Sequence, residues 1–524
     1  MEEQTWINRK LDFIDRYAKA QNAASGSDVD ANANVTTKNI ATLQGEIVKD
    51  DMIKINRAVM DRYLRQDYGD EVADQYKQDL KEHYIYSHDE TGLAPYCVAV
   101  SLYPFLLNGL KDLGGSSLPP KHADSYIGGM INLIFLLAGQ YLGAVAVPEF
   151  LPYFDYFLRK DFGDDYIDHL DEQVILYGNR KETLRDRIED WFQQFVYSIN
   201  QPAGSRNYQS PFVNISYYDK GYFSSIFKDF VFPDGTEPKW ETTKELQKLF
   251  IKWFNQERTL SILTFPVETF NILFDKETHK YEDEESADFV ADAWAHGHSF
   301  FLYNSDSADA LSSCCRLKNA IDENVFSYTL GAGGIQTGSK KVITMNLNRI
   351  VQDWYNKEKN KHTLSEYIST ITRRIHKYLS AWNHWLWDLY DSNLLTVYKA
   401  GFISLDKQFL SLGVNGFIEG AEFLADKDSK YKGLETLPDN EQYKQYVKDV
   451  LETIKQINKE DKVIEHKIYE LNINGFTYVI PSKTKLSVID TTGNISVKSI
   501  DDLILLKDDF DIDEAELVQY RVIK

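Results

Sequence analysis

The sequence reads CCRL at residues 314–317, GAGGIQTGS at residues 331–339 and VITMNL at residues 342–347. This order predicts a β-hairpin with two cysteines near its tip, then a glycine-rich connection and a strand. If these thiols are opposed by Cys97, the only other cysteine of the chain, they have the makings of a radical or redox centre. Because a buried cysteine more often acts as a small apolar side chain, a purely structural pair is the alternative interpretation.

The overall composition is that of a large, acidic, globular protein. The chain has 524 residues, of which 43% are hydrophobic, and a formal net charge of -22. The electrostatic field of this negative charge repels the phosphates of nucleic acids and anionic lipids. A few helix N-termini and arginines nevertheless suffice to bind a small phosphorylated substrate. Three cysteines make no disulfide framework, and no secretory signal opens the sequence. We therefore expect a cytoplasmic protein that binds neither nucleic acid nor membrane.

One segment, at residues 126–147, is nearly apolar enough to suggest a membrane span. It contains Asn132, Gln140 and several glycines, and no cluster of Lys or Arg flanks it. We therefore predict a helix that is buried all round in a large core.

The rest of the chain alternates between helical and strand-like segments. An amphipathic helix is predicted near residues 5–20, and apolar helical runs alternate with short β-rich pieces over residues 94–413. This rhythm predicts one large α/β domain, either a barrel or a doubly wound sheet. Residues 425–461 are predicted to be helical, and residues 463–524 to form a β-rich tail with a hairpin turn at 491–494.

Other local motifs leave the chemistry open. The glycines at 331–338 lack the lysine of a Walker loop, and the spacing of His83 and His88 fits no metal motif. Within residues 265–272, a proline and a carboxylate follow a β-like run. In α/β barrels the loops at the C-terminal ends of strands carry function. The glycine turn within 412–422 opens a helix, and it is either an anion site at free N–H groups or a simple helix start.

Ten short blocks match the order of motifs in one enzyme family. They lie at residues 32–36, 84–89, 95–97, 121–125, 143–146, 210–215, 265–272, 313–317, 337–349 and 412–422. Together they resemble the catalytic subunit of an anaerobic (class III) ribonucleoside-triphosphate reductase over residues 30–461. The resemblance implies a ten-stranded α/β barrel with a central finger loop, as in the glycyl-radical lyases.

The two ends of the chain lie outside this resemblance. Residues 1–29 are predicted to be an N-terminal helix and a polar loop. Residues 462–524 form a divergent, β-rich tail that resembles the opening of a Hint (intein-like) module. Val479 stands where such a module needs its splicing nucleophile, which disfavours self-splicing.

The resemblance also implies the roles of individual residues. Cys315 matches the thiyl-radical position that abstracts the ribose 3′ hydrogen, and Cys97 matches the partner that assists loss of the 2′ hydroxyl. Cys314 is the variable neighbour, and Ser339 lies in the polar stretch that the family places near the substrate hydroxyls. The implied substrate-binding residues are Phe265, Pro266, Thr269, Gln336, Thr337, Gly413, Val414, Asn415 and Gly416.

The sequence departs from the family pattern after its last thiol. No cysteine follows Cys315, so the family's cysteine-pair zinc site and Arg-Val-Cys-Gly-Tyr glycyl-radical loop do not occur in it. We therefore expect no metal in this chain and a glycyl radical supplied in trans by a second polypeptide. The resemblance implies a radical-SAM activating protein, dNTP or ATP effectors and a homodimer, although no ATP-cone signature precedes Asp30. It leaves open whether formate or a thiol protein donates the electrons.

The predicted function is therefore the anaerobic reduction of ribonucleoside triphosphates to deoxyribonucleoside triphosphates, in a split or truncated subunit. Two alternatives stay open. One is a different glycyl-radical-type enzyme, such as a lyase acting on a non-nucleotide. The other is a catalytically silent regulatory subunit, which the retention of Cys97 and Cys315 disfavours because such a subunit has no chemical need for both thiols.

Overall fold

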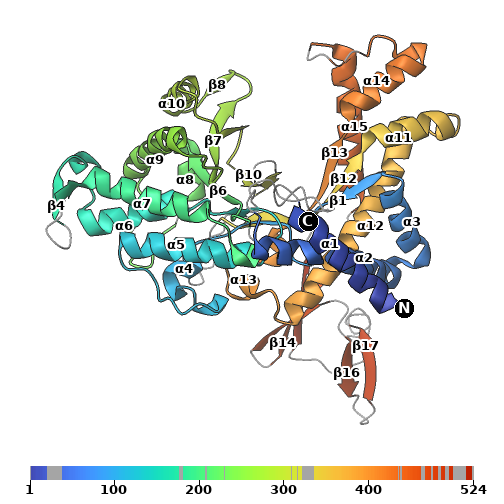
Figure 1. Ribbon diagram of the computed structural model, residues 1–524, viewed down its shortest axis with the longest axis horizontal. Coiled ribbons are helices and arrows are strands. Elements are labelled where there is room, and N and C mark those ends of the chain that lie inside the picture. The colour runs from blue at the N-terminus through green and yellow to red at the C-terminus, as the bar shows by residue number, and fades with distance from the viewer. Residues whose placement is uncertain are drawn as a thin grey trace. The chain divides into compact units, whose positions relative to one another are not determined.

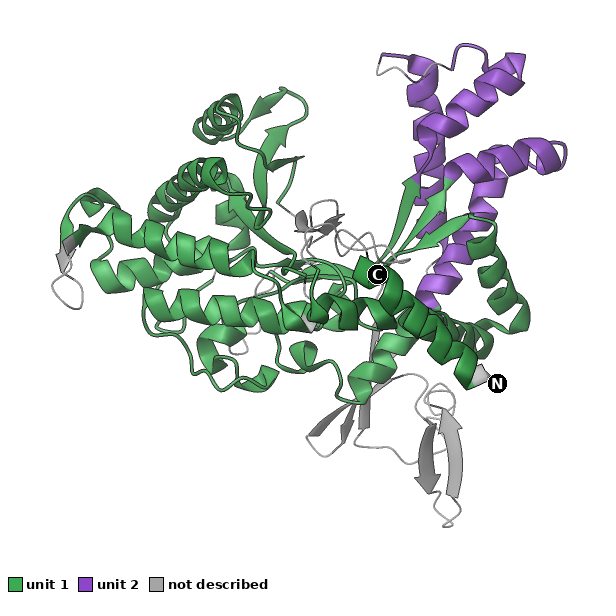
Figure 2. Cartoon of the chain, in the orientation of Figure 1, with its two compact units in different colours: residues 1–346, 381–414 green, residues 347–380, 415–524 purple. Residues whose placement is uncertain are grey.

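A computed structural model gives the fold. It describes residues 2–19, 38–175, 181–206, 209–228, 230–308, 310–314, 317–320, 335–434, 436, 439–461, 467–473, 476–481, 485–489, 495–499 and 515–521. The chain divides into two compact units (Figure 2). The first comprises Met1–Asn346 and Ala381–Val414, and the second comprises Leu347–Ser380 and Asn415–Lys524.

A curled, mixed sheet is the centre of the first unit. Its strand order is β1 (Ile85–Ser87), β12 (Thr337–Asn346), β2 (Cys97–Ala99), β3 (Val145–Ala146), β6 (Val213–Tyr218), β7 (Val267–Asp275) and β8 (Lys280–Tyr281), with β9 (Phe301–Ser305) on β7 and β13 (Phe409–Asn415) on β12. The pairs from β2 through β3 and β6 to β7 and β9 are parallel, whereas β12 and β1 add antiparallel pairs. The predicted α/β class is confirmed, and closure into a ten-stranded barrel stays a prediction.

Helices cover the parallel strands, and aromatic side chains fill the space between them. The helices of this region are α4 (Tyr103–Asn108), α5 (Ala123–Ala138), α6 (Phe150–Phe162), α7 (Leu184–Ile199), α8 (Lys220–Ile226), α9 (Trp240–Leu260) and α10 (Glu284–Ala295). α6 contacts both α5 and α9, and α7 contacts the same two helices (Figure 1). Phe150 on α6 stacks on Phe195 of α7 with ring centroids 4.2 Å apart. β6 is buried at every position, as expected for a parallel strand in the interior.

The apolar segment at residues 126–147 is helical only in its first part. α5 ends at Ala138, with Gly139 as its C-cap, and the chain then turns into β3. Ile127 and Met130 are fully buried, as predicted. The helix is not buried all round, however, because Asn132 is exposed. No helix in the described part of the chain is long and apolar enough to cross a membrane.

Three helices form the N-terminal part of the first unit. They are α1 (Glu2–Lys19), α2 (Ile40–Tyr68) and α3 (Asp70–Lys81). The predicted first helix is confirmed as α1. α2 begins with a reciprocal cap, in which Asn39 Oδ1 accepts hydrogen bonds from the backbone of Ala41 and Thr42 while Thr42 Oγ1 accepts one from the Asn39 N–H.

The predicted hairpin around the cysteine pair is confirmed in its backbone. β10 (Ala310–Cys314) pairs antiparallel with β11 (Leu317–Ala320), and Cys314 lies opposite Leu317. Neither strand joins the large sheet among the described residues, yet β10 contacts β2, β3, β6, β7 and β12. The hairpin therefore crosses the sheet instead of extending its edge.

The second unit is helical with a β-rich end. It contains α11 (Leu347–Asp353), a π-helical turn (Trp354–Glu358), α14 (Phe417–Lys427) and α15 (Glu441–Glu460), and it shares α12 (Leu364–Asp391) with the first unit. The described strands of the tail are β14 (Lys467–Ile473), β15 (Phe476–Pro481), β16 (Lys485–Ile489), β17 (Ile495–Ser499) and β18 (Ala515–Arg521). β16 and β17 are antiparallel, as the predicted turn requires, but residues 491–494 lie outside the described residues. Of the helix predicted over residues 425–461, α15 covers Glu441–Glu460, and the described residues of the tail are strands.

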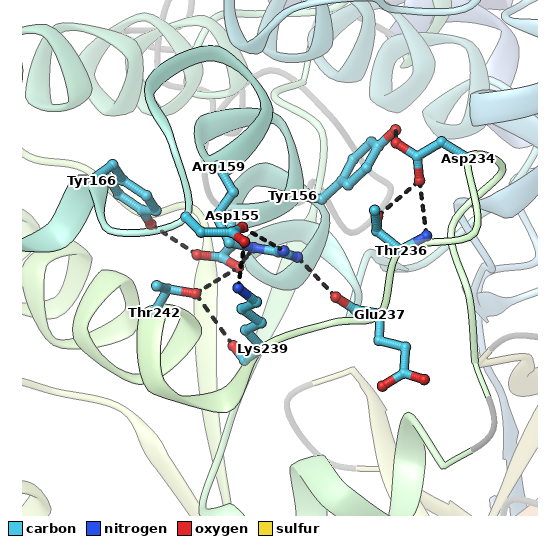
Figure 3. A network of polar contacts seen from close by, with 10 residues as sticks. Asp155, Tyr156, Arg159, Tyr166, Asp234, Thr236, Glu237, Lys239 and Thr242 are labelled. Atoms are coloured by element: carbon cyan, nitrogen blue, oxygen red, sulfur yellow. Dashed lines mark hydrogen bonds and ion pairs between the residues drawn. The ribbon is translucent and has the colours of Figure 1, made fainter.

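A buried ion pair anchors α6 to the segment that precedes α9 (Figure 3). Arg159 Nε donates to Asp155 Oδ2 at 2.9 Å, and the Asp155 side chain is fully buried. The hydroxyls of Tyr166 and Thr242 also donate to this carboxylate, at 2.9 and 3.0 Å. The guanidinium in turn donates to the carbonyl of Glu237. Because both charges have several partners, the network holds these elements in one arrangement.

We expect Asp155→Asn to lower the free energy of unfolding by about 3–5 kcal/mol, because it leaves the buried Arg159 charge with only the longer contact to the exposed carboxylate of Asp164, at 3.3 Å. Urea denaturation at neutral pH measures this loss. Arg185→Met is the matched control, since it removes an exposed pair with Asp171 and is expected to cost about 1 kcal/mol or less. Equal losses in the two variants would contradict an anchoring role for the buried pair.

Candidate functional site

Two predicted catalytic residues lie directly opposite each other in the sheet. Cys97 on β2 pairs in register with Ser339 on β12. Directly paired residues of neighbouring strands project to the same face, so the thiol and the hydroxyl share one face. Ser339 Oγ lies 2.8 Å from Ser411 Oγ on β13. Since Cys97 and Ser339 are both buried, the three side chains form a small polar row in a dry setting.

Both the side chain and the backbone of Cys97 are held by neighbouring residues. The backbone N–H of Ala144 donates to Sγ at 3.1 Å, and Gln408 Nε2 donates to the Cys97 carbonyl at 2.8 Å. Gly143 is packed so closely that a Cβ there would lie 2.4 Å from Sγ. Any larger residue at this position would therefore displace the thiol.

Arg206 fixes the loop that surrounds this thiol. Its guanidinium donates to the carbonyls of Tyr141, Leu142 and Gly143 at 3.3, 3.2 and 3.0 Å. Burial lowers the pKa of Arg206, whereas its electrostatic interaction with Cys97 acts in the opposite direction. Arg206 Nε has no hydrogen-bond partner within the described part of the chain. Sequence reasoning missed this residue, because only the fold brings it next to Cys97.

Glu149 joins the ends of three strands. This buried residue follows β3, and its carboxylate accepts hydrogen bonds from the backbone N–H groups of Leu102, just beyond β2, and Ile335, just before β12. The distances are 2.6 and 2.8 Å. Burial raises the pKa of Glu149 to about 7, although the two backbone donors oppose the shift. The carboxylate thus fixes the start of the strand that carries Ser339.

A second polar row lies on β6 and β7. Asn214 Nδ2 donates to Thr269 Oγ1 at 3.1 Å, and Asn271 Nδ2 donates to the Tyr217 carbonyl at 3.0 Å. The Oδ1 atoms of both asparagines are buried and lack partners among the described residues. β10 contacts both strands. Polar residues inside the apolar strands VNISYY and VETFNILFD were the signal that sequence reasoning overlooked.

The carboxylate of the 265–272 motif was predicted to follow a strand, but it lies within one. β7 begins at Val267, so Glu268 belongs to the strand itself. Its buried carboxylate accepts from Arg258 Nη1 at 2.8 Å and contacts His298 Nε2 at 3.0 Å. Because these partners come from α9 and from the segment before β9, the carboxylate has a structural role on the helix-covered face.

Among the predicted substrate-binding residues, Phe265 is linked to Cys97 through one intervening ring. Phe265 packs edge-on against Phe212, at a centroid distance of 5.1 Å, and Phe212 packs against the cluster of Cys97 and Ala144. Thr337 and Thr269 are fully buried in β12 and β7, and Pro266 is buried directly before β7. Gln336 lies just before β12, where its side chain bonds the backbone of Gly401 and Ser404.

The predicted phosphate-binding residues at 413–416 run from the end of β13 to the N-cap of α14. Gly413 packs on Thr344 so closely that a Cβ would lie 2.5 Å from Oγ1. Gly416, with φ of 79°, is the N-cap of α14, which confirms the predicted glycine turn before a helix.

The predicted radical position itself cannot be placed. Cys315 and Arg316 lie outside the described residues, as do the glycines at 331, 333 and 334. Cys314 is the last residue of β10. Among the described side chains, no group of three or more His, Cys, Asp or Glu residues is arranged to hold a metal ion.

The comparisons with known proteins agree with this geometry. The family model described as "Anaerobic ribonucleoside-triphosphate reductase" matches residues 40–473. The chain belongs to this family and is an oxidoreductase of the anaerobic ribonucleotide reductase type. No curated protein matches the sequence.

Solved structures of anaerobic ribonucleotide reductases share the fold. The Thermotoga maritima enzyme with citrate in the active site is 29% identical, with a TM-score of 0.67, over 81% of this chain and 72% of that chain. A further anaerobic ribonucleotide reductase is 27% identical, with a TM-score of 0.70, over 87% and 67%. The Thermotoga maritima enzyme in complex with dATP and CTP is 29% identical, with a TM-score of 0.67, over 80% and 66%.

The raised pKa of Glu149 predicts a pH-dependent stability. Between the ordinary carboxyl value of 4.5 and about 7, the folded protein binds more protons at this residue than the unfolded chain does. Stability from this group is therefore greatest below pH 4.5 and falls as the pH rises to 7, by about 3 kcal/mol in total. We expect Glu149→Gln to lose this component, which urea denaturation of both proteins between pH 5 and about 7.5 measures. Parallel pH profiles for the two proteins would contradict it.

We expect Arg206→Met to release the loop around Cys97, because three carbonyls lose their donor. Losing even one such bond, worth about 1–1.5 kcal/mol, raises the population of an open loop roughly tenfold. Alkylation of Cys97 by iodoacetamide in the folded protein should accelerate by about this factor, as followed by peptide mass spectrometry. Alkylation of Cys314 and Cys315 in the same samples is the internal control. An unchanged Cys97 rate would show that Arg206 does not hold the loop.

Proposed function

We propose that this chain provides the substrate site and the thiol chemistry for the reduction of ribonucleoside triphosphates to deoxyribonucleoside triphosphates. The observation that supports this most directly is the register pair of Cys97 and Ser339 beneath a crossing hairpin. β10 contacts β2, and the residue that follows its last position is Cys315. Within a ten-stranded barrel of the family type, this arrangement gives two opposed thiols and a hydroxyl around one ribose.

Each side chain has a distinct role in the proposed reaction. Cys315, as a thiyl radical, takes the 3′ hydrogen of the ribose and returns it at the end. Cys97 delivers a proton to the departing 2′ hydroxyl, which leaves as water, and a formate or thiol reductant supplies the two electrons. Ser339, bonded to Ser411, holds the hydroxyls of the ribose in place. The buried positions of Cys97 and Ser339 favour such chemistry because they exclude water from the radical.

The proposal assigns the radical store to another polypeptide. A glycyl radical supplies the unpaired electron for Cys315 when its domain is bound, and a radical-SAM protein generates that radical. A homodimer is part of the proposal, as in the family resemblance.

Substrates and effectors follow from the structural relatives. The Thermotoga maritima reductase was solved in complex with dATP and CTP. We therefore propose ribonucleoside triphosphates as substrates and dNTP or ATP as effectors. Phe265, Pro266, Thr269, Gln336 and Thr337 would line the substrate site. Residues 413–416, which end β13 and lead into α14, would bind the phosphates, since the free N–H groups at a helix N-terminus favour an anion.

The decisive experiment is anaerobic reconstitution with the activating protein and a glycyl-radical polypeptide. We expect Cys97→Ser and Cys315→Ser each to lower conversion of labelled CTP to dCTP by at least roughly a hundredfold, because each thiol acts in the reaction itself. Cys314→Ser is the matched control and should retain activity. Full activity in either of the first two variants would refute the assignment of the thiols.

Thermal unfolding separates this function from that of a lyase acting on a non-nucleotide. A bound ligand raises apparent stability by mass action, so ribonucleoside triphosphates should raise the melting temperature of a reductase. Absence of any such shift, together with inactivity in the reconstituted mixture, would favour the lyase, whereas a shift without activity would favour the catalytically silent subunit, which keeps the nucleotide-binding barrel.

A further inference from the structure

Gln408 is a buried amide beside the thiol that the proposed reaction does not use. It is 2% exposed and lies between a 3₁₀ turn (Leu405–Lys407) and the first residue of β13. Its Nε2 donates to the carbonyl of Cys97 at 2.8 Å, and its Oε1 accepts from the Tyr398 hydroxyl at 2.5 Å. Both ends of the amide therefore have a partner, and one partner is the backbone of the thiol residue.

These two partners allow the amide only one orientation. A backbone carbonyl can only accept a hydrogen bond, so the NH2 end of Gln408 must face Cys97. The oxygen end then faces Tyr398, whose hydroxyl is the donor. Tyr398 is itself buried, in the short helix α13 (Thr396–Lys399), and its ring lies 6.2 Å from that of Tyr141. A buried hydroxyl thus holds the amide in the orientation that bonds Cys97.

Gly338 leaves the space through which the amide reaches β2. This residue of β12 pairs with Val98 and has φ of 153°, a conformation that favours glycine. A Cβ at this position would lie 2.4 Å from the Cys97 carbonyl oxygen and 3.1 Å from Gln408 Nε2. Any side chain here would therefore push the amide and the carbonyl away from each other.

The amide closes a ring of contacts around the row of Cys97, Ser339 and Ser411. β2 and β13 both pair with β12, but they do not pair with each other in the described sheet. Ser339 is in register with Cys97 on one side and lies 2.8 Å from Ser411 Oγ on the other. Gln408, three residues before Ser411, joins the two outer strands directly. The ring restrains the thiol residue relative to both hydroxyls.

We propose that Gln408, oriented by Tyr398, is a positioning residue for the Cys97 thiol. It fixes the backbone of Cys97 against Ser339 and Ser411, and neither of its two partners is a reacting atom. The catalytic consequence rests on the proposed function of Cys97. The restraint on the thiol does not, because it is a property of the folded chain whether or not the chain is active.

Two variants of the full chain test the proposal. Gln408→Met removes both hydrogen bonds at similar size, and alkylation of Cys97 by iodoacetamide in the folded protein should accelerate about tenfold. Tyr398→Phe removes only the donor that orients the amide, so we expect a smaller acceleration of about threefold. In the reconstituted mixture, the kcat of Gln408→Met for labelled CTP should fall about tenfold or more, with KM within about twofold of the wild type. KM is expected to stay because the amide bonds the protein and not the substrate.

Gln247→Met is the matched control. Gln247 is 3% exposed, and its amide also makes two hydrogen bonds, from the N–H of Tyr218 at 2.9 Å and to the carbonyl of the same residue at 3.1 Å. The substitution therefore removes an equally buried and equally bonded amide between α9 and β6, and it should leave Cys97 alkylation and kcat unchanged. Melting temperatures are measured first, and Tyr398→Phe decides if Gln408→Met does not fold.

Each outcome separates the positioning role from the alternatives. Faster alkylation of Cys97 in Gln408→Met and Tyr398→Phe, but not in Gln247→Met, supports the proposal. An unchanged Cys97 rate in Gln408→Met, or an equal acceleration in the control, overturns it. A higher KM at unchanged kcat overturns it as well, because it assigns the amide to substrate binding. Accelerated alkylation in a chain whose wild type makes no dCTP refutes the proposed function and leaves the restraint on Cys97 supported.

Discussion

The register between β2 and β12 is the constraint on which the candidate active site depends. It places Cys97 opposite Ser339, and a shift of one residue would turn either side chain to the other face of the sheet. The antiparallel ladder alone does not secure this register over three paired residues. Glu149 adds to it by accepting N–H groups beyond the end of β2 and before the start of β12. A single buried carboxylate therefore fixes a geometry that the chemistry needs.

Buried charges recur in this fold wherever backbone segments must be held without regular pairing. Arg206 binds three consecutive carbonyls of a loop, and the Asp155–Arg159 pair anchors a segment before α9. A buried charge rarely adds stability compared with an apolar residue of the same size. A buried charge instead fixes the local geometry, because its hydrogen bonds form only when the partner groups are correctly placed. Around the buried Cys97 thiol, Arg206 fixes the neighbouring loop in this way.

Local chemistry explains what could be predicted from the sequence. The hairpin at the cysteine pair, the helix start at Gly416 and the first helix each follow from residues adjacent in the chain. Glu149 and Arg206 could not be found that way, because their roles depend on partners many residues distant. The 126–147 segment shows the same limit, since its apolar composition suits both α5 and β3 and only the tertiary fold divides it. The prediction that Glu268 follows a strand was wrong for the same reason, because the residue lies inside β7.

In this acidic member of the anaerobic ribonucleoside-triphosphate reductase family, the electric field at a buried site differs from the field of the whole chain. Screening in physiological salt reduces the effect of surface charges beyond about 8 Å, so distant carboxylates contribute little at a buried site. Nearby donors then decide which ligand is accepted. The free N–H groups at the start of α14 and the unpaired Nε of Arg206 favour anions. An acidic chain can therefore still accept an anionic ligand, because binding depends on a few nearby polar atoms and not on the net charge.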